Sequence, residues 1–375
     1  MKFWKSSGNK PASRTQWSDM AIRVKILSRS PPVNPENPRF SRQLPTGWAE
    51  ANGLEFIFGP DARNYDWLVV YDDLPRFIGM TEEPLACPPE NTLLITSEPS
   101  GVKVYGRSFV RQFGHVLTSQ EPIALRHPGR IWSQAGLTWY YGMDENRHDY
   151  LPVDEIARRF PEKTETIATV CSSKRQSHTL HRLRYDFTEY AAKHLPELQV
   201  FGHGRRHMDD KAEAIDRFRY HLAIENHVAP HHITEKLSDP FLGLSLPFYF
   251  GAPNVFDYFP AQSLIPVDIR KPAEAVEIMR AAIASNEYEK RLPAIIEARR
   301  RVIEDYNMFA LIARIVRSDT PARYVPAVTA IRGQHAARKA APVSGIADFA
   351  FRTGLQFKNR IANLRSPDWS SPKAG

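Results

Sequence analysis

The sequence predicts an α/β protein with two domains, each built on a parallel β-sheet. Its 375 residues are enough for two separate hydrophobic cores. In the first half, short apolar runs alternate with turn-rich connections, and in the second half strand and helix patterns follow one another regularly. Strands that alternate with helices favour parallel sheets covered by helices on both faces.

The first half contains short apolar runs that we predict as strands. The helices between them are weakly marked, whereas the proline-rich segment 31–38 is expected to be a loop. The predicted strands are Ile22–Leu27, Leu54–Phe58, Trp67–Tyr71, Thr92–Thr96 and His115–Thr118.

The second half shows a clearer alternation of strands and helices. Its last predicted helix is long and amphipathic, with many charges on the outer face. We expect strands at Thr166–Cys171, Leu198–Phe201, Tyr220–Ile224, just before Gly251 and at Leu264–Ile269, and helices at His178–His194, at Lys211–Phe218, after Thr234, from Pro272 and at Glu287–Arg317.

These patterns divide the chain into a first domain at residues 1–155, a second domain at 156–318 and a basic tail at 319–375. The whole chain has a net charge of +8, and the tail alone holds nearly all of this excess. The two domains together are therefore close to neutral. A nucleic-acid-binding protein would carry its positive charge on the folded domains, so we expect no nucleic-acid partner.

Composition also indicates where the protein acts. No apolar run approaches the ~18–20 residues of a transmembrane helix, and the basic N-terminus lacks the apolar segment of a secretory signal. Cys87 and Cys171, the only cysteines, have neither metal-binding nor disulfide spacing. We therefore expect a cytoplasmic protein without a disulfide framework.

The most specific pattern in the chain follows a predicted strand that ends at Glu225 and Asn226. Thr234 is then a good N-cap for a helix whose first turn holds Glu235 and Lys236. The N–H groups and positive dipole at such a helix start, together with the lysine charge, favour a phosphate or diphosphate. The tripeptide alone also begins many helices that bind nothing.

The longer pattern resembles the donor-site signature of glycosyltransferase family 10, the fucosyltransferases. The likeness extends from about Ser172 to Ile269 and includes ENx(7)TEKL, the segment PFYFGAPNVFDYFP and a Gly-His-Gly turn at 202–204. This resemblance implies the GT-B fold, in which two Rossmann-like domains face each other across a cleft. It places the acceptor on the N-terminal domain and the nucleotide sugar on the C-terminal domain.

The activity that the resemblance implies is inverting transfer of a sugar, most simply fucose, from a GDP-sugar to a hydroxyl of a glycan. A cell-surface polysaccharide or lipopolysaccharide chain would be a suitable acceptor. Two alternatives stay open. One is a transferase of the same fold that uses another nucleotide sugar, and the other is a non-catalytic glycan- or membrane-binding protein with a degenerate transferase fold.

The resemblance also assigns residues to the donor site. Lys236 and an arginine would neutralise the departing diphosphate, and the spacing in the family favours Arg182 as that arginine, with Arg184 as the alternative. The other implied donor contacts are Glu225 and Asn226 near the sugar and its phosphate, Glu235 at the ribose hydroxyls and Gly202 in the turn beside the nucleotide.

The acceptor hydroxyl needs a general base, and Glu98 is the candidate. It follows the apolar strand 92–96 in the sequence Ser-Glu-Pro, and a carboxylate held at a strand end is suited to accept a proton. The resembled family similarly places a glutamate after a strand of its N-terminal domain. Other glutamates nearby are alternatives: Glu82, Glu83, Glu90 and Glu121.

No metal site is expected. His227, His231 and His232 share one loop but lack accompanying carboxylate or thiol ligands. By resemblance, transfer needs no cofactor, although Mg or Mn could stimulate it. His232 stands where relatives commonly carry a tyrosine, which leaves its role in the donor site open. Asp72-Asp73 is interpreted as an ordinary turn.

The tail interleaves aromatic and aliphatic residues with cations over 346–361. On a helix, Phe351, Leu355 and Ile361 would share a face, with Arg352 and the cations of 358–360 at its rim. This pattern is typical of a helix that lies on an anionic membrane, and it predicts peripheral binding to the inner face of the cytoplasmic membrane. The alternatives are packing against the protein's own body and disorder.

Overall fold

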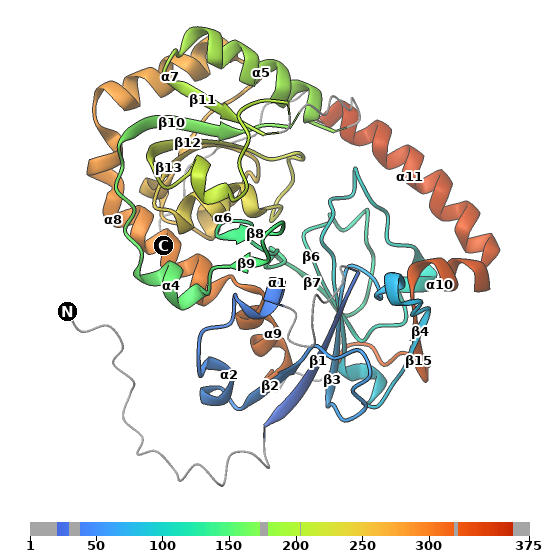
Figure 1. Cartoon of the computed structure of the whole chain (residues 1–375). Helices are drawn as coiled ribbons and strands as arrows, with labels where there is room; N and C mark the ends of the chain where they lie inside the picture. Colours follow the sequence, from blue (N-terminus) through green and yellow to red (C-terminus); the bar gives the residue numbers. More distant parts are fainter. Residues whose placement is uncertain (1–20, 30–37, 173–178, 203, 319–321, 363–375) are drawn as a thin grey trace.

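The structure, a computed structural model, describes residues 21–29, 38–172, 179–202, 204–318 and 322–362. Two α/β domains form separate lobes in Figure 1, and each contains its own parallel sheet. This is the GT-B arrangement, so the predicted fold class is confirmed.

Among the described residues, six parallel strands form the N-terminal sheet in the order β2-β1-β3-β5-β6-β7. All strands predicted in this half are confirmed to within one residue at each end, whereas β7 is too short to stand out in the sequence. The strands are β1 (Ile22–Ser28), β2 (Leu54–Ile57), β3 (Trp67–Tyr71), β5 (Thr92–Ile95), β6 (His115–Thr118) and β7 (Arg130–Trp132).

The C-terminal sheet is also parallel, with the order β11-β10-β12-β13-β14 in the described chain. Its central strand β12 is buried along most of its length, as expected for a sheet covered on both faces. The strands are β10 (Glu165–Val170), β11 (Leu198–Phe201), β12 (Phe218–Ile224), β13 (Leu246–Phe250) and β14 (Ile265–Pro266).

Helices cover this sheet largely where the sequence predicts them. The segment predicted as a helix at Lys211–Phe218 forms only a 3-10 turn, η3 (Lys211–Ala214), because Phe218 already pairs with Glu165 as the first residue of β12. The helices are α5 (His181–His194), α6 (Glu235–Leu242), α7 (Pro272–Ala284) and α8 (Glu287–Arg300). Short helices and a hairpin complete the two domains: α1 (Pro38–Ser41), α2 (Trp48–Ala51), α3 (Arg107–Val110), α4 (Val153–Arg158), β8 (Met143–Asp144) and β9 (Asp149–Tyr150).

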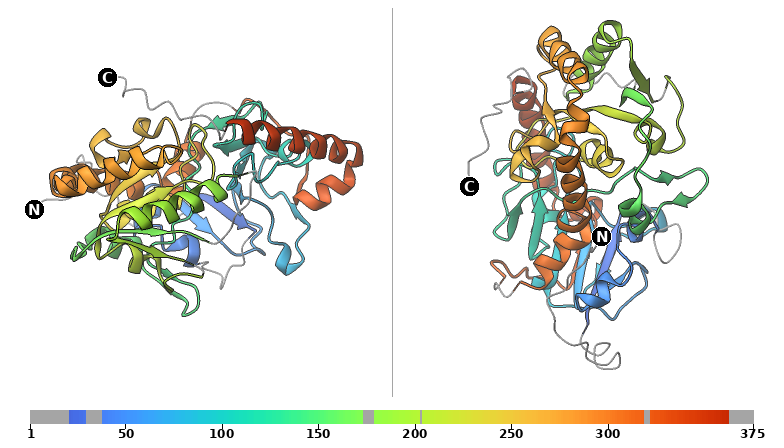
Figure 2. Two further views of the ribbon diagram at one scale, coloured as in Figure 1. Left: turned by 90° about the horizontal axis from the view of Figure 1, so that it is seen from above. Right: turned by 90° about the vertical axis from the view of Figure 1, so that its left-hand side faces the viewer.

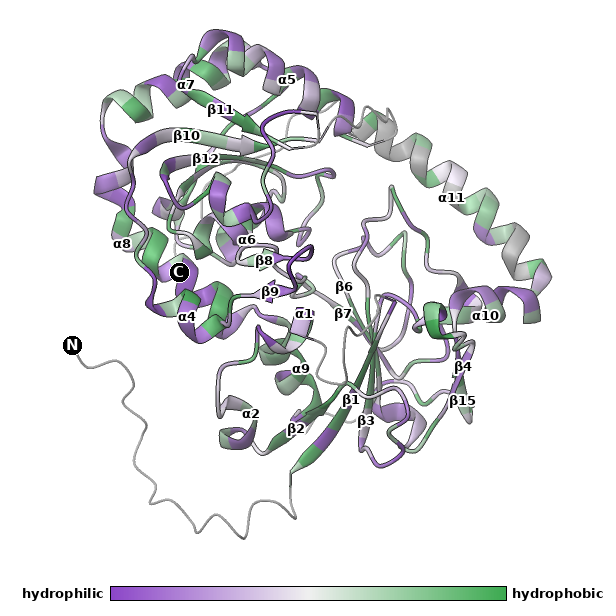
Figure 3. Cartoon of the chain, viewed as in Figure 1, coloured by the Kyte–Doolittle hydropathy of each residue, from purple (hydrophilic) through white to green (hydrophobic). Residues whose placement is uncertain are grey.

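Each domain has its own apolar core. Figure 3 shows hydrophobic residues concentrated in the strands of both sheets. The largest core surrounds the C-terminal sheet and includes Phe248, Tyr249 and Phe250 of β13. Two further cores lie on the faces of the N-terminal sheet.

The predicted long helix at Glu287–Arg317 is interrupted. A π-helical turn, η6 (Arg301–Asp305), separates α8 from α9 (Met308–Val316). The cause is Asn307, whose side chain accepts a hydrogen bond from the Ala310 N–H at 3.0 Å and so caps a new helix. Its amide also donates to the Ile303 carbonyl at 2.7 Å.

The chain returns to the N-terminal domain after α8, which corrects the predicted boundary at residue 318. Helix α9 packs into the core of the N-terminal sheet through Phe309 and Ile312 (Figures 1 and 2). The predicted tail contributes as well: β15 (Ala330–Arg332) pairs antiparallel with β4 (Glu82–Pro84), and Ile331 is fully buried. Burial of these apolar side chains places residues 308–316 and 330–340 in the first domain.

The described part of the tail ends in α10 (Gln334–Ala340) and α11 (Pro342–Ala362), and α11 is a rod on the outside of the molecule in Figure 1. The predicted apolar face is wrong in one respect, because Leu355 is buried whereas Ile361 is exposed. Large apolar side chains still point to solvent, with Phe349 70% and Phe357 67% exposed. The side chains of Ile346, Arg352, Lys358, Asn359 and Arg360 lie outside the described part. In the described chain, no helix is long and apolar enough to span a membrane.

Candidate active site

A cavity of about 820 Å³ lies between the two domains. It brings the predicted base, Glu98, into the same space as the predicted phosphate ligand, Lys236. The N-terminal wall includes Arg29, Arg39, Phe40, Tyr71, Asp72, Ser97 and Glu98, and the C-terminal wall includes His181, Asn226, His232, Thr234, Glu235 and Lys236.

A second cavity of about 230 Å³ adjoins the first at the ends of β10 and β12. The two cavities share His181, Asn226, Glu235 and Lys236. The smaller one lies within the C-terminal domain, at the carboxyl ends of parallel strands, where α/β folds commonly bind ligands. Its remaining polar lining is provided by Thr169, Ser172, Arg184, Lys211, His221 and Asp239.

The start of α6 is held in place by a buried carboxylate. Glu225 accepts hydrogen bonds from the N–H of Thr234 at 2.8 Å and from its hydroxyl at 2.7 Å. The Thr234 hydroxyl in turn accepts from the N–H of Lys236 at 3.2 Å, as an N-cap does. Glu225 is fully buried and lines neither cavity. Its predicted donor contact is therefore not supported, and its role is to orient the helix start.

Burial also changes the protonation of Glu225. The apolar surroundings raise the pKa of its carboxyl to about 7, although Lys236 lies nearby and opposes the shift. Glu235 behaves in the opposite way. Burial alone would raise its pKa, but Lys236 and Lys211 outweigh burial and lower it to about 2.

The charges on α6 form a paired network that opens onto both cavities. The Lys236 ammonium lies 2.7 Å from a Glu235 oxygen. Lys211, from the turn before β12, lies 2.9 Å from Asp239 and 3.9 Å from Glu235. Sequence reasoning missed Lys211 and Asp239, because their pairing joins two segments with no local signal in common.

Arg184, and not Arg182, is the arginine at the site. Arg184 is 6% exposed, donating to the Asn226 side-chain oxygen at 2.7 Å and to the Ser172 hydroxyl at 3.2 Å. The Arg182 side chain is 71% exposed, pairs with Asp186 and lines neither cavity. The prediction that favoured Arg182 is corrected, because the inward face of α5 carries residue 184.

Gly202 has a structural role. It follows β11 with a φ of +128°, and a Cβ at this position would lie 2.5 Å from the Cys171 carbonyl oxygen. The residue lines neither cavity. The predicted nucleotide contact at Gly202 is therefore not supported. The predicted tight turn at this residue agrees with its positive φ. His203, the next residue, lies outside the described chain.

Glu98 follows β5 and is open to solvent in the large cavity. Partial desolvation raises the pKa of its carboxyl, and the nearby charge of Asp72 raises it further. The turn that carries Glu98 is fixed by the Tyr105 hydroxyl, which accepts from the N–H groups of Ser97 at 3.1 Å and Glu98 at 3.4 Å.

Asp72 anchors this turn and is more than an ordinary turn residue. Its side chain accepts hydrogen bonds from the hydroxyl of Tyr105, from Ser97 at 2.9 Å and from the Lys103 ammonium at 2.7 Å. Asp72 adopts a φ of 71°, a left-handed conformation that is uncommon outside glycine. Its partners are some thirty residues away in sequence, so only the folded chain shows the network.

The loop histidines do not gather around one point. The His232 ring lies 3.4 Å from the Ser119 hydroxyl, and His227 lies 3.4 Å from Glu121. Burial lowers the pKa of His232 to about 3, which keeps its ring neutral. Within the described residues, no group of three or more histidine, cysteine or acidic side chains could hold a metal ion.

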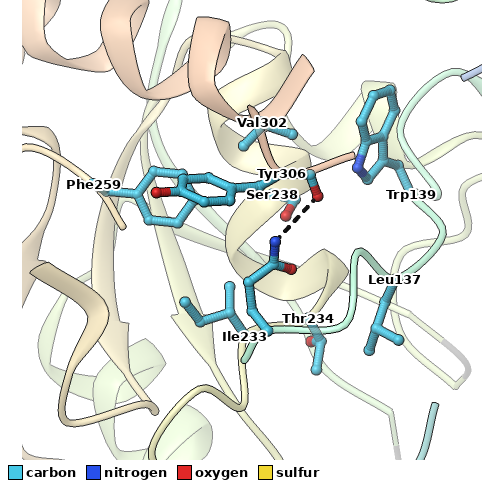
Figure 4. A pocket seen from close by; sticks show the side chains of 9 residues that line it. Leu137, Trp139, Ile233, Thr234, Ser238, Phe259, Val302 and Tyr306 are labelled. Atoms are coloured by element: carbon cyan, nitrogen blue, oxygen red, sulfur yellow. Dashed lines mark hydrogen bonds between the residues drawn. The ribbon is translucent and has the colours of Figure 1, made fainter. Parts of the chain in front are cut away.

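A third, very small cavity lies behind the start of α6 and is shown in Figure 4. Thr234 and Ser238 meet Trp139 and Tyr306 there, and the Gln134 amide donates to the Tyr306 carbonyl at 3.3 Å. Its volume of about 10 Å³ is hardly enough for one water molecule. The interdomain segment therefore packs closely against α6, and this cavity is not a ligand site.

Comparison with known proteins finds a family match for part of the chain. Residues 160–290 match the model of "Glycosyltransferase family 10 (fucosyltransferase) C-term". Among solved structures, an α1,3-fucosyltransferase is similar, with 14% identity, a TM-score of 0.49, and 86% of this chain and 96% of that chain covered.

The complex of an α1,3-fucosyltransferase with GDP-fucose gives 13% identity, a TM-score of 0.45, and coverage of 86% and 95%. The structure of TarM is also similar, with 8% identity, a TM-score of 0.37, and 61% of this chain and 55% of that chain covered. No curated protein sequence matches the chain. The family match covers residues 160–290, which include the donor-site motif, and it supports a glycosyltransferase.

Proposed function

We propose that the protein transfers fucose from GDP-fucose to a hydroxyl of a glycan, with inversion at the anomeric carbon. The observation that carries this proposal is the interdomain cavity, which has a carboxylate with a raised pKa, Glu98, on one wall and Lys236 at a helix N-terminus on the other.

The C-terminal wall suits a nucleoside diphosphate. Arg184 and Lys236 supply two cations to the lining of the smaller cavity, and the uncapped N–H groups of α6 add further donors. As the bond between the sugar and the phosphate breaks, negative charge grows on the departing diphosphate. Cations fixed in advance stabilise this charge without having to reorganise.

The N-terminal wall suits the acceptor. Glu98 takes the proton of the acceptor hydroxyl while that oxygen forms a bond to the anomeric carbon, and GDP leaves from the opposite face. A raised carboxyl pKa makes Glu98 a stronger base near neutral pH. The aromatic rings of Phe40, Tyr71 and Tyr140 line the same cavity and can pack against sugar rings.

The finer features are part of this proposal. We keep the expectation that transfer needs no bound metal, with Mg or Mn acting as stimulants. The acceptor is proposed to be a cell-surface polysaccharide or lipopolysaccharide chain, extended on the cytoplasmic side of the membrane.

Helix α11 supports a peripheral position on that membrane. Val343, Phe349, Phe357 and Ile361 are exposed on it. Residues 320–375 also carry a net charge of +7, and this charge favours an anionic surface by about 1 kcal/mol for each cation that reaches it. The tail cations are Arg323, Arg332, Arg338, Lys339, Arg352, Lys358, Arg360, Arg365 and Lys373, opposed by Asp348 and Asp368.

Truncation after Ala341 tests the membrane position, because it removes α11 and leaves the buried strand β15 intact. The full chain should sediment with vesicles containing phosphatidylglycerol and dissociate as salt rises. The truncated chain should not sediment but should keep its hydrolysis of GDP-fucose. Equal sedimentation of both forms would exclude docking through α11.

The central experiment measures donor choice. The temperature of thermal unfolding is measured with GDP, with UDP and without nucleotide. Hydrolysis of GDP-fucose is followed by mass detection. We expect GDP to stabilise strongly and fucose to be released. A stronger effect of UDP would support another nucleotide sugar, and no effect of either would support a non-catalytic protein.

A further inference from the structure

Two buried side chains that line the smaller cavity each have one polar atom without a partner among the described residues. They are His221, which is 5% exposed, with its Nδ1, and Arg184, which is 6% exposed, with its Nε. A buried polar atom left unpaired is costly, and such atoms in native structures commonly meet a ligand or water. Both therefore indicate that this cavity is built to be filled.

The chemistry of the His221 atom follows from its other hydrogen bond. The ring lies on β12 and makes a hydrogen bond to the backbone of Ala214 that raises the pKa of His221. A hydrogen bond that raises this pKa is one that the ring N–H donates, so the acceptor is the Ala214 carbonyl. Burial and the charge of Lys211 lower the pKa of His221 to about 3, so the ring is neutral. A neutral imidazole carries one N–H, and the unpaired Nδ1 is then a hydrogen-bond acceptor.

The surrounding charges do not satisfy this acceptor. Two cations act on His221, and both already have partners. Lys211 is paired with Asp239 at 2.9 Å, and Lys163 donates to the Gly243 carbonyl at 2.6 Å. The donor must therefore come from what enters the cavity. Ile215, Leu222 and Pro240 provide apolar surfaces in the lining, and the volume of about 230 Å³ has room for a nucleobase.

The position of the two unpaired atoms gives the bound molecule a direction. Arg184 and Asn226 lie at the carboxyl end of β12, beside Lys236, where the diphosphate is proposed to bind. His221 lies earlier on the strand and therefore deeper. A nucleotide anchored by its phosphates at the strand end would extend its base toward His221.

We propose that His221 is a specificity residue of the donor site, whose Nδ1 accepts a hydrogen bond from an N–H group on the edge of guanine. This inference rests on the proposed GDP-sugar donor. Guanine presents N1–H and a 2-amino group on that edge, whereas adenine presents an unprotonated N1 and a C2–H at the same positions and has its amino group at C6. An acceptor that faces positions 1 and 2 of the ring thus selects guanine, because adenine offers it no N–H group there.

Calorimetric titration with GDP, ADP and inosine diphosphate tests the proposal on the full chain. The wild-type protein should prefer GDP to ADP. In His221→Phe, which keeps the ring shape without the nitrogens, this preference should fall about tenfold, the value of one buried hydrogen bond. His221→Asn can present its side-chain oxygen where Nδ1 lies and should recover part of the preference. Inosine diphosphate, which lacks the 2-amino group, tells which N–H is read.

The outcomes separate this inference from the proposed function. Thermal unfolding without nucleotide checks that each variant is folded. An unchanged ratio of GDP to ADP affinity in folded His221→Phe would overturn the role of His221 and leave the donor assignment standing. Equal weakening of GDP and ADP, as a ribose contact would give, would overturn it as well. Failure of the wild-type protein to bind GDP would instead contradict the proposed function.

Discussion

The two walls of the interdomain cavity are built in different ways. The C-terminal wall comes largely from one continuous segment, in which Glu225 fixes Thr234 and Thr234 begins the helix that carries Lys236. The N-terminal wall is assembled from separate strand ends, because Asp72 follows β3 while Ser97 and Glu98 follow β5. A wall made from one segment leaves a motif in the sequence, and a wall assembled from distant segments does not.

The difference between the walls also predicts different functions for them. If the N-terminal wall supplies the base, Glu98→Gln should reduce turnover by roughly 10³-fold, since the amide keeps the size of the side chain but accepts no proton. Steady-state transfer from GDP-fucose measures this. Glu55→Gln, an exposed glutamate of the same sheet, is the matched control and should behave as wild type. Turnover within a few-fold of wild type in Glu98→Gln would remove the base from this wall.

The C-terminal wall should contribute through charge. Lys236→Ala should lower turnover by about 10²-fold, the range for loss of one electrostatic stabiliser of a transition state. Arg184→Ala should have a comparable effect, whereas Arg182→Ala should be nearly silent because its side chain is exposed to solvent. A severe loss in Arg182→Ala together with a mild one in Arg184→Ala would reverse the assignment made from the structure.

Asp72 tests whether the N-terminal wall acts as a network. Asp72→Asn should reduce turnover about tenfold, since it weakens the hold on the turn that carries Glu98. It should also shift the acidic limb of the kcat/KM profile to lower pH, because the negative charge of Asp72 raises the pKa of Glu98. Asp61→Asn, an exposed aspartate in the same domain, serves as control. An unmoved acidic limb would show that Asp72 does not act on Glu98.

The smallest expected effect is on stability at the C-terminal wall. The folded-state pKa of Glu225 is raised to about 7, so its protonated form stabilises the fold at low pH, and this contribution is lost as pH rises through that value. Glu225→Gln cannot titrate at this position. Between pH 5 and pH 8 its unfolding free energy should therefore fall by less than that of the wild-type protein, and the two falls should differ by up to about 3 kcal/mol. Urea unfolding at both pH values measures this. An identical pH slope in the two proteins would mean that Glu225 is ionised throughout.

Much of the fold could be predicted from local patterns, and the errors arose where distant contacts decide the structure. The strands at 67–71 and 198–201 and the cap at Thr234 follow from residues close in sequence. The break before α9 could not be predicted, because the Asn307 amide donates to the Gln43 carbonyl, which is far away in the sequence. The return of β15 to the first domain depends on the same kind of long-range packing.

The candidate site follows the same rule. Asn226, Glu235 and Lys236 lie where the motif predicts them, and Glu98 faces them across the cavity. The choice between Arg182 and Arg184 failed because the register of α5 on the sheet, and not the spacing of the motif, decides which arginine points inward. Lys211, His221 and the Asp72 network carry no signal in the sequence that would single them out.

The affinity for GDP tests most directly whether the two walls divide binding from base catalysis. Calorimetric titration should give the same Kd for Glu98→Gln as for the wild-type protein, and a Kd at least tenfold higher for Lys236→Ala, since only the latter loses a charge at the diphosphate. A Kd unaffected by Lys236→Ala, or raised by Glu98→Gln in a folded protein, would contradict the assignment of the donor to the C-terminal wall.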